Sequence, residues 1–139
     1  MATLMTDREI TGERIDVLLR FLPLLLQEGR HFSKIPPQEY TDDGTLIMVH
    51  PIYDDDVARF FHEASASWWS DYHYLAHPAH KKLNDFEFIG RASMDEIRTL
   101  LTTCVRGERF CDGFWENVLH SGTVLRILER LQELRLDLE

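Results

Sequence analysis

The sequence predicts a mainly α-helical fold: a small bundle of about five helices with at most one short strand or hairpin in residues 44–53. Apolar residues recur at steps of three and four along most of the chain, and two expected helix starts have the spacing of a capping box. Three of the five prolines fall within residues 30–53, which marks that stretch as irregular. A chain of 139 residues with 44% hydrophobic residues suits one domain, residues 1–139, around one core.

The first helix is expected just after Thr6, which stands three residues before Glu9 as in a capping box. The apolar positions that follow at helical steps are Ile15, Leu18, Leu22 and Leu25. Pro23 lies inside this run, and proline removes an amide donor and clashes with the preceding turn. We therefore expect a bend near Leu22.

The middle of the chain is expected to hold one short strand, Leu46–Val49, and then a second helix that runs to about Trp69. The carboxylates of Asp54–Asp56 favour a helix start, because unpaired amides and the helix dipole attract negative charge there. The apolar face of this helix is Val57, Phe60, Phe61, Ala64 and Trp68. Residues 70–91 are expected to form mixed turns and short helix.

Three further helices are expected in the last third of the chain. Ser93 and Glu96 repeat the capping-box spacing ahead of an apolar stripe that includes Cys104. Gly113 and Gly122 bracket a shorter helix, and the last helix begins near Thr123. This last helix carries a narrow apolar seam that could pair with a second copy of the chain: Val124, Ile127, Leu131 and Leu134. Packing of the same seam inside its own bundle is the commoner arrangement.

Negative charge is concentrated in the middle of the chain. The net charge is −9, and the residues between Pro36 and Tyr72 supply −7 of it, with eight acids and one base. Such a surface repels phosphates and attracts a basic protein groove, including one that normally holds nucleic acid. The residues we expect to contact a partner are Asp42, Asp43, Asp54, Asp55 and Asp56, with Trp68 and Trp69 as aromatic anchors. The alternative is a solvated acidic face with ordinary helix capping.

No pattern in the sequence indicates catalysis, a cofactor or a bound metal. A Gly-rich phosphate loop, a GxSxG elbow and zinc-finger spacing are all absent. His73, His77 and His80 have the spacing of one helical face, but Pro78 disfavours that helix, so we predict no metal site. An alternative hypothesis is a small enzyme or a ligand pocket that includes a reactive thiol, built from Arg106, Arg109, Cys111 and His120.

Residues 100–134 contain the string RGERFCDG, followed by a glycine and a leucine-rich helix. The positions concerned are Leu100, Leu101, Thr102, Arg106, Arg109, Phe110, Cys111, Asp112, Gly113, Gly122, Ile127, Leu128, Arg130 and Leu131. This segment resembles the C-terminal signature of a widespread bacterial domain family of unknown function. The run Leu18–Pro23 resembles the first helix of that family, and the two segments cover about a third of the chain.

The resemblance supports the helical fold and implies no activity, ligand or catalytic residue. One interpretation of the signature is a turn that orients two helices, with Phe110 anchored in the core and Asp112 capping the second helix. The other is that Arg106, Arg109, Cys111 and Asp112 line a pocket for an anionic ligand.

The function that the sequence favours is a non-catalytic acidic protein-binding domain. Its partner is expected to be a basic protein, such as one that handles nucleic acid, and small phage-encoded inhibitors of bacterial defence share this size and charge. We expect no direct contact with nucleic acid or membrane. The longest apolar run is Phe21–Leu26, and the early acids do not fit a secretion signal, so a cytoplasmic location is expected.

Overall fold

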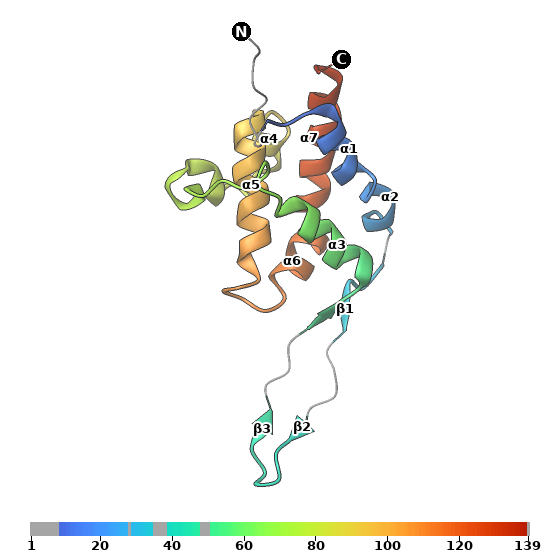
Figure 1. Cartoon of the computed structure of the whole chain (residues 1–139), viewed down its shortest axis with the longest axis vertical. Coiled ribbons are helices and arrows are strands. Elements are labelled where there is room, and N and C mark those ends of the chain that lie inside the picture. The colour runs from blue at the N-terminus through green and yellow to red at the C-terminus, as the bar shows by residue number, and fades with distance from the viewer. Residues whose placement is uncertain (1–8, 28, 35–38, 48–50, 139) are drawn as a thin grey trace.

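A computed structural model describes residues 9–27, 29–34, 39–47 and 51–138 (Figure 1). Two helices of 14 residues, α5 (Met94–Gly107) and α7 (Thr123–Leu136), lie side by side in the bundle. Helix α7 also contacts α1, α2, α4 and α6, so it is the element around which the others pack. The mainly helical prediction is confirmed, with five helices of seven residues or more among the described residues.

The N-terminal helix is interrupted, as Pro23 predicted. Helix α1 (Gly12–Leu19) ends ahead of a separate turn, α2 (Leu22–Leu25), which has the proline in its first turn, where no amide donor is needed. The observed N-cap of α1 is Thr11, which accepts a hydrogen bond from the Arg14 amide at 3.3 Å. The predicted cap, Thr6, lies outside the described residues.

Helix α3 (Asp55–Ala64) begins where the sequence predicted but ends five residues before Trp69. The hydroxyl of Ser65 donates to the carbonyl of His62 at 2.6 Å, and that of Ser70 donates to the carbonyl of Ala66 at 3.1 Å. Such local bonds compete with continuation of the helix. The segment that follows holds the 3-10 turns η1 (Tyr74–Ala76) and η2 (Pro78–Lys81) and the short α4 (Phe86–Ile89), as expected for mixed turns.

The capping box of α5 is present. The Glu96 amide donates to Ser93 Oγ at 3.2 Å, and the Ser93 amide donates to Glu96 Oε1 at 2.9 Å. Helix α6 (Phe114–His120) follows Gly113, and α7 follows Gly122. Both glycines have a φ near +85°, a backbone conformation that glycine adopts without strain.

In the described part of the segment between α2 and α3, four strands of two residues form an arm. Strand β1 (Ser33–Lys34) pairs antiparallel with β4 (Ile52–Tyr53), and β2 (Glu39–Tyr40) pairs antiparallel with β3 (Leu46–Ile47). Figure 1 shows the β2–β3 hairpin projecting beyond the end of the bundle. The expected strand at Leu46 is present as β3, whereas β1 and β2 lie before the predicted stretch, because two residues are too few to show an alternating pattern.

One hydrophobic core fills the bundle. Helix α5 contributes Ile97, Leu100, Leu101 and Cys104, and α7 contributes Val124, Ile127, Leu128 and Leu131, each at most 1% exposed. The apolar seam predicted on the last helix therefore packs inside its own chain, with Leu134 partly buried at its edge. Among the helices of the described residues, none combines the length and apolar character that a bilayer span requires.

Candidate binding arm and its attachment to the bundle

The outer part of the arm, residues 39–47, exposes every one of its side chains. Three of these are large and apolar: Tyr40 is 59% exposed, Leu46 is 47% exposed and Ile47 is 41% exposed. The same nine residues carry three acids, Glu39, Asp42 and Asp43, and no base. We call residues 39–47 the outer hairpin.

The tip of the outer hairpin is an ordered turn. The Thr41 amide donates to the carbonyl of Thr45 at 2.8 Å, and Gly44 adopts a φ of +86°. The hydroxyl of Thr41 and the amide of Thr45 both donate to Asp43 Oδ1. Hydrogen bonds from Thr41 and Thr45 lower the pKa of Asp43 to about 2.

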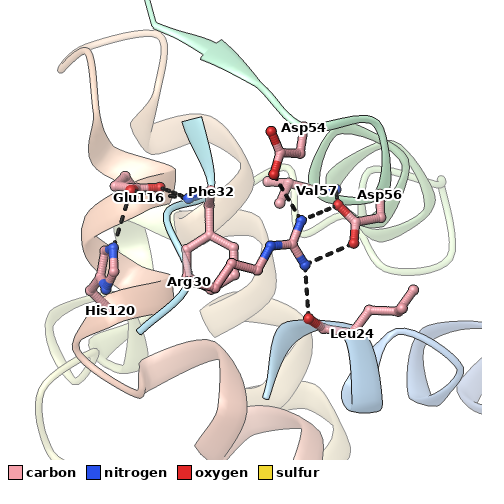
Figure 2. A network of polar contacts seen from close by, with 8 residues as sticks. All are labelled: Leu24, Arg30, Phe32, Asp54, Asp56, Val57, Glu116 and His120. Carbon is pink, nitrogen blue, oxygen red and sulfur yellow. Dashed lines mark hydrogen bonds and ion pairs between the residues drawn. The ribbon is translucent and has the colours of Figure 1, made fainter. Parts of the chain in front are cut away.

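Arg30 attaches the base of the arm, which is the β1–β4 pair, to α2 and α3 (Figure 2). Its guanidinium binds both oxygens of Asp56, at 2.8 and 2.5 Å, and Asp54 at 3.1 Å, and it donates to the carbonyl of Leu24 at 2.8 Å. The hydrogen bonds from Arg30 lower the pKa of Asp56. Two of the five acids predicted for partner contact, Asp54 and Asp56, are thus both paired with one structural cation from outside the acidic segment.

Phe32 attaches strand β1 to α6. Its amide donates to both carboxylate oxygens of Glu116, each at 3.2 Å, and its carbonyl accepts from the amide of Asp54 at 3.0 Å. Its ring is only 3% exposed. Figure 2 shows Arg30 on one side of this residue and Glu116 with His120 on the other.

Glu108 lies within the RGERFCDG string and connects strand β4, at the base of the arm, to α6. Its Oε1 accepts from the Tyr53 hydroxyl at 2.7 Å and from the Trp115 amide at 2.9 Å, and its Oε2 accepts from the Gly113 amide at 2.9 Å. One carboxylate therefore caps α6 and holds β4. Burial and the bond to Glu108 raise the pKa of Tyr53. The signature acts as a structural corner that also positions the arm.

A family model described as a family of unknown function, DUF6508, matches residues 10–137 of the chain, and this match spans the bundle, the arm and the signature. The chain belongs to the DUF6508 family. The resemblance seen in residues 100–134 is thereby confirmed and extends to nearly the whole chain. No curated protein and no solved structure matches it.

Two expectations about the DUF6508 signature are wrong. Phe110 is 80% exposed and does not anchor the corner in the core, where the ring of Trp115 instead stacks on Phe61 at 4.3 Å. Capping of α6 comes from Glu108 rather than from Asp112. The spacing of the residues predicted the position of the turn correctly. It could not show that Glu108, five positions before Gly113, caps the helix that follows the turn.

The four residues of the predicted ligand pocket lie in different surroundings. A surface cavity of about 400 Å³ lies between α3 and the corner after α5, and Arg109 is the only one of the four in its wall. Arg106 lies over the ring of Tyr74, 5.6 Å from its centroid, and His120 contacts Glu116. Cys111 is exposed, whereas Cys104 is buried, as predicted, and burial raises its pKa to about 12.

The predicted aromatic anchors are also not equivalent. Trp69 is 1% exposed and belongs to the core, so it is not available to a partner. Trp68 is half-buried beneath the guanidinium of Arg14, which lies 3.9 Å from its ring centroid. Asp55, on the first turn of α3, is exposed.

Two of the three histidines considered in the sequence as metal ligands, His77 and His80, make hydrogen bonds to nearby backbone atoms. His77 Nδ1 accepts from the Ala79 amide at 3.0 Å and caps η2, and His80 Nδ1 lies 2.9 Å from the His77 carbonyl. In the described part of the chain, the group with metal-ligand geometry is a different one: His31, Glu116 and His120. The spacing of Glu116 and His120, four residues on one helix, was a visible signal, but the third member is 85 residues away.

Proposed function

We propose that the protein is a non-catalytic protein-binding domain whose outer hairpin inserts into a basic, partly apolar cleft of a protein partner. The supporting observation is that all nine residues of the outer hairpin are exposed, including three large apolar side chains. About half of each of these residues stays exposed to solvent in a single chain, and a projecting cluster of this kind is typical of interaction sites.

Charge defines the kind of partner. Glu39, Asp42 and Asp43 lie within three residues of the exposed Tyr40 in the sequence, and the outer hairpin contains no base. Complementary charge favours a basic partner and speeds its encounter, while an aromatic side chain at the centre supplies most of the binding energy in such interfaces. A protein that holds nucleic acid has a cleft of this type, and we propose that the DUF6508 protein inhibits or regulates one.

The first experiment locates the partner. A photo-crosslinking amino acid at Tyr40 or Ile47 should capture a protein in the cells that express the chain naturally. The same amino acid at Leu75, which is 67% exposed on the bundle, is the matched control. A partner captured at Leu75 and not at the hairpin would contradict the proposal.

The second experiment measures affinity with the purified partner. Neutralising the outer hairpin (Glu39→Gln, Asp42→Asn, Asp43→Asn) should weaken binding about tenfold or more and reduce its salt dependence. The control neutralises three exposed acids on the bundle (Glu13→Gln, Glu87→Gln, Asp137→Asn) and makes the same change in net charge. Equal weakening by both variants would show that overall charge, rather than the hairpin, drives binding.

A second candidate function rests on the cavity near Arg109. Its floor includes the stacked rings of Phe61 and Trp115, and its wall includes His62 and Arg109. An apolar floor with a guanidinium suits a flat anionic ligand. A thermal-shift screen of such ligands should give a stabilisation that Arg109→Gln abolishes and Arg106→Gln preserves, and a response that both variants keep would contradict this site.

A further inference from the structure

We propose that His31, Glu116 and His120 form a site for one divalent transition-metal ion, of which zinc is the most suitable, at the junction of the arm and the bundle. Each residue offers one ligand atom, and these three atoms lie within 4.8 Å of one another. Two imidazoles and a carboxylate are ligands that zinc accepts together, and the two nitrogens disfavour magnesium and calcium.

The fold brings these residues together in two ways. Glu116 and His120 are four residues apart on α6, so their side chains lie on one face of the helix. His31 directly precedes Phe32, whose amide donates to Glu116. The contact that attaches β1 to α6 therefore also places His31 next to α6. The junction of arm and bundle therefore assembles the three ligands.

Two of the ligand atoms already have the spacing that a metal requires. His120 Nε2 and Glu116 Oε1 are 3.1 Å apart (Figure 2). With zinc bonds of about 2.0–2.2 Å, tetrahedral ligand atoms lie roughly 3.4 Å from each other. His31 is exposed, so a rotation of its side chain can close the remaining distance.

The surroundings hold these ligands in place. The Phe32 amide fixes the Glu116 carboxylate, which is the role of the outer hydrogen-bond partners in metal sites. The ring of His120 packs edge-on against the ring of Phe32 at 5.3 Å and against that of His31 at 6.1 Å. The guanidinium of Arg30, which lies over the ring of Phe32, is bound by Asp54 and Asp56.

Three protein ligands leave an open position on a tetrahedral ion. Both histidines are exposed, so an ion can enter from solvent and the open position can hold water or a group from another molecule. The inference is independent of the proposed partner, because it concerns binding of the metal alone.

The test is a titration of the full-length metal-free protein with Zn²⁺ in competition with a chromophoric chelator. All proteins carry Cys111→Ser, which removes the exposed thiol as a competing ligand. We expect one ion per chain, and His31→Gln and His120→Gln should each weaken binding about tenfold or more. The matched control is the double variant His73→Gln, His80→Gln, which should bind as the parent does.

Thermal unfolding supplies a second readout. Zinc in excess should raise the Tm of the parent and of the control variant, because an ion that binds only the folded state stabilises it, and it should raise the Tm of His31→Gln clearly less, because weaker binding gives less stabilisation. His31 and His120 are exposed, so their variants should fold, which far-UV circular dichroism checks. Stoichiometric binding that both ligand variants retain with the affinity of the parent, or no stoichiometric binding by the parent, would overturn the proposal.

Discussion

At the residue scale, a few polar side chains each serve more than one element. Glu108 accepts three hydrogen bonds, from β4, from the residue before α6 and from α6 itself. Arg30 joins α2 to α3 through a carbonyl and two carboxylates. Because each removal leaves several partners unsatisfied, these residues should matter more to stability than their partial exposure indicates.

Glu108→Ala should lower the free energy of unfolding by about 2–3 kcal/mol, because two amides at the start of α6 and the Tyr53 hydroxyl lose their acceptor. Tyr53→Phe removes only one of the three bonds and should cost about 1 kcal/mol. Urea denaturation followed by circular dichroism measures both. Equal costs for the two variants would show that Glu108 does not cap α6.

The Arg30–Asp56 pair should make stability depend on acid pH. The Arg30 guanidinium holds the folded-state pKa of Asp56 below its ordinary value of 3.8, so the ionised form favours folding. This contribution is complete above pH 3.8 and is lost as the pH falls through the lower folded-state pKa.

Asp56→Asn should therefore cost about 1–3 kcal/mol at pH 7, and the difference from wild type should shrink below pH 3.8. Denaturant unfolding at a series of pH values measures this difference. Asp55→Asn, a neighbouring exposed acid on the same helix, is the control and should cost at most about 0.5 kcal/mol. A penalty for Asp56→Asn that stays constant down to pH 2 would exclude the ion pair as its cause.

At the element scale, the sequence predicts helices well and the arm poorly. The stripe of α5 and its capping box are local patterns, so they identified the helix and its first residue. The arm has strands of two residues, which carry no period, and its attachments to α3 and α6 join residues 24 to 84 positions apart. The same limit applies to the candidate metal site. The spacing of Glu116 and His120 on α6 can be recognised in the sequence, whereas the closeness of His31 to this pair cannot.

The outer hairpin should be dispensable for folding, while the base of the arm should not. Tyr40→Ser with Ile47→Ser should change Tm by less than about 1 °C, because both side chains are already exposed in the folded chain. Phe32→Ala should cost about 3–5 kcal/mol, because this ring is 3% exposed. Differential scanning calorimetry compares the two, and a large loss for the double variant would show that the outer hairpin packs on the bundle.

At the scale of the whole molecule, the acidic segment is divided between two places. Asp42 and Asp43 lie at the tip of the arm, whereas Asp54 and Asp56 lie at its base and are paired with Arg30. The strong charge bias of the sequence therefore does not form one continuous contact surface. Asp42 and Asp43 are exposed on the outer hairpin and Asp55 is exposed on α3. The proposed contact is placed on the outer hairpin because this element also carries the exposed apolar side chains.

The oligomeric state tests whether the apolar seam of α7 packs inside its own chain or against a second chain. The sequence left open a homodimer through the α7 seam, in which Leu131→Lys would separate two folded chains. Leu131 is 0% exposed in the core of a single chain, so its replacement by lysine buries an ammonium without a partner, and this costs several kcal/mol. We therefore expect Leu131→Lys to unfold the protein.

Leu136→Lys is the matched control, because Leu136 lies on the same helix and is 68% exposed. It should leave the bundle folded, as circular dichroism would show, and sedimentation velocity gives the mass of both variants and of the parent. A folded, monomeric Leu131→Lys protein derived from a dimeric parent would contradict the packing of α7 inside its own bundle. A dimeric parent that only Leu136→Lys dissociates would instead place the contact on the exposed end of α7, where an interface does not compete with the core.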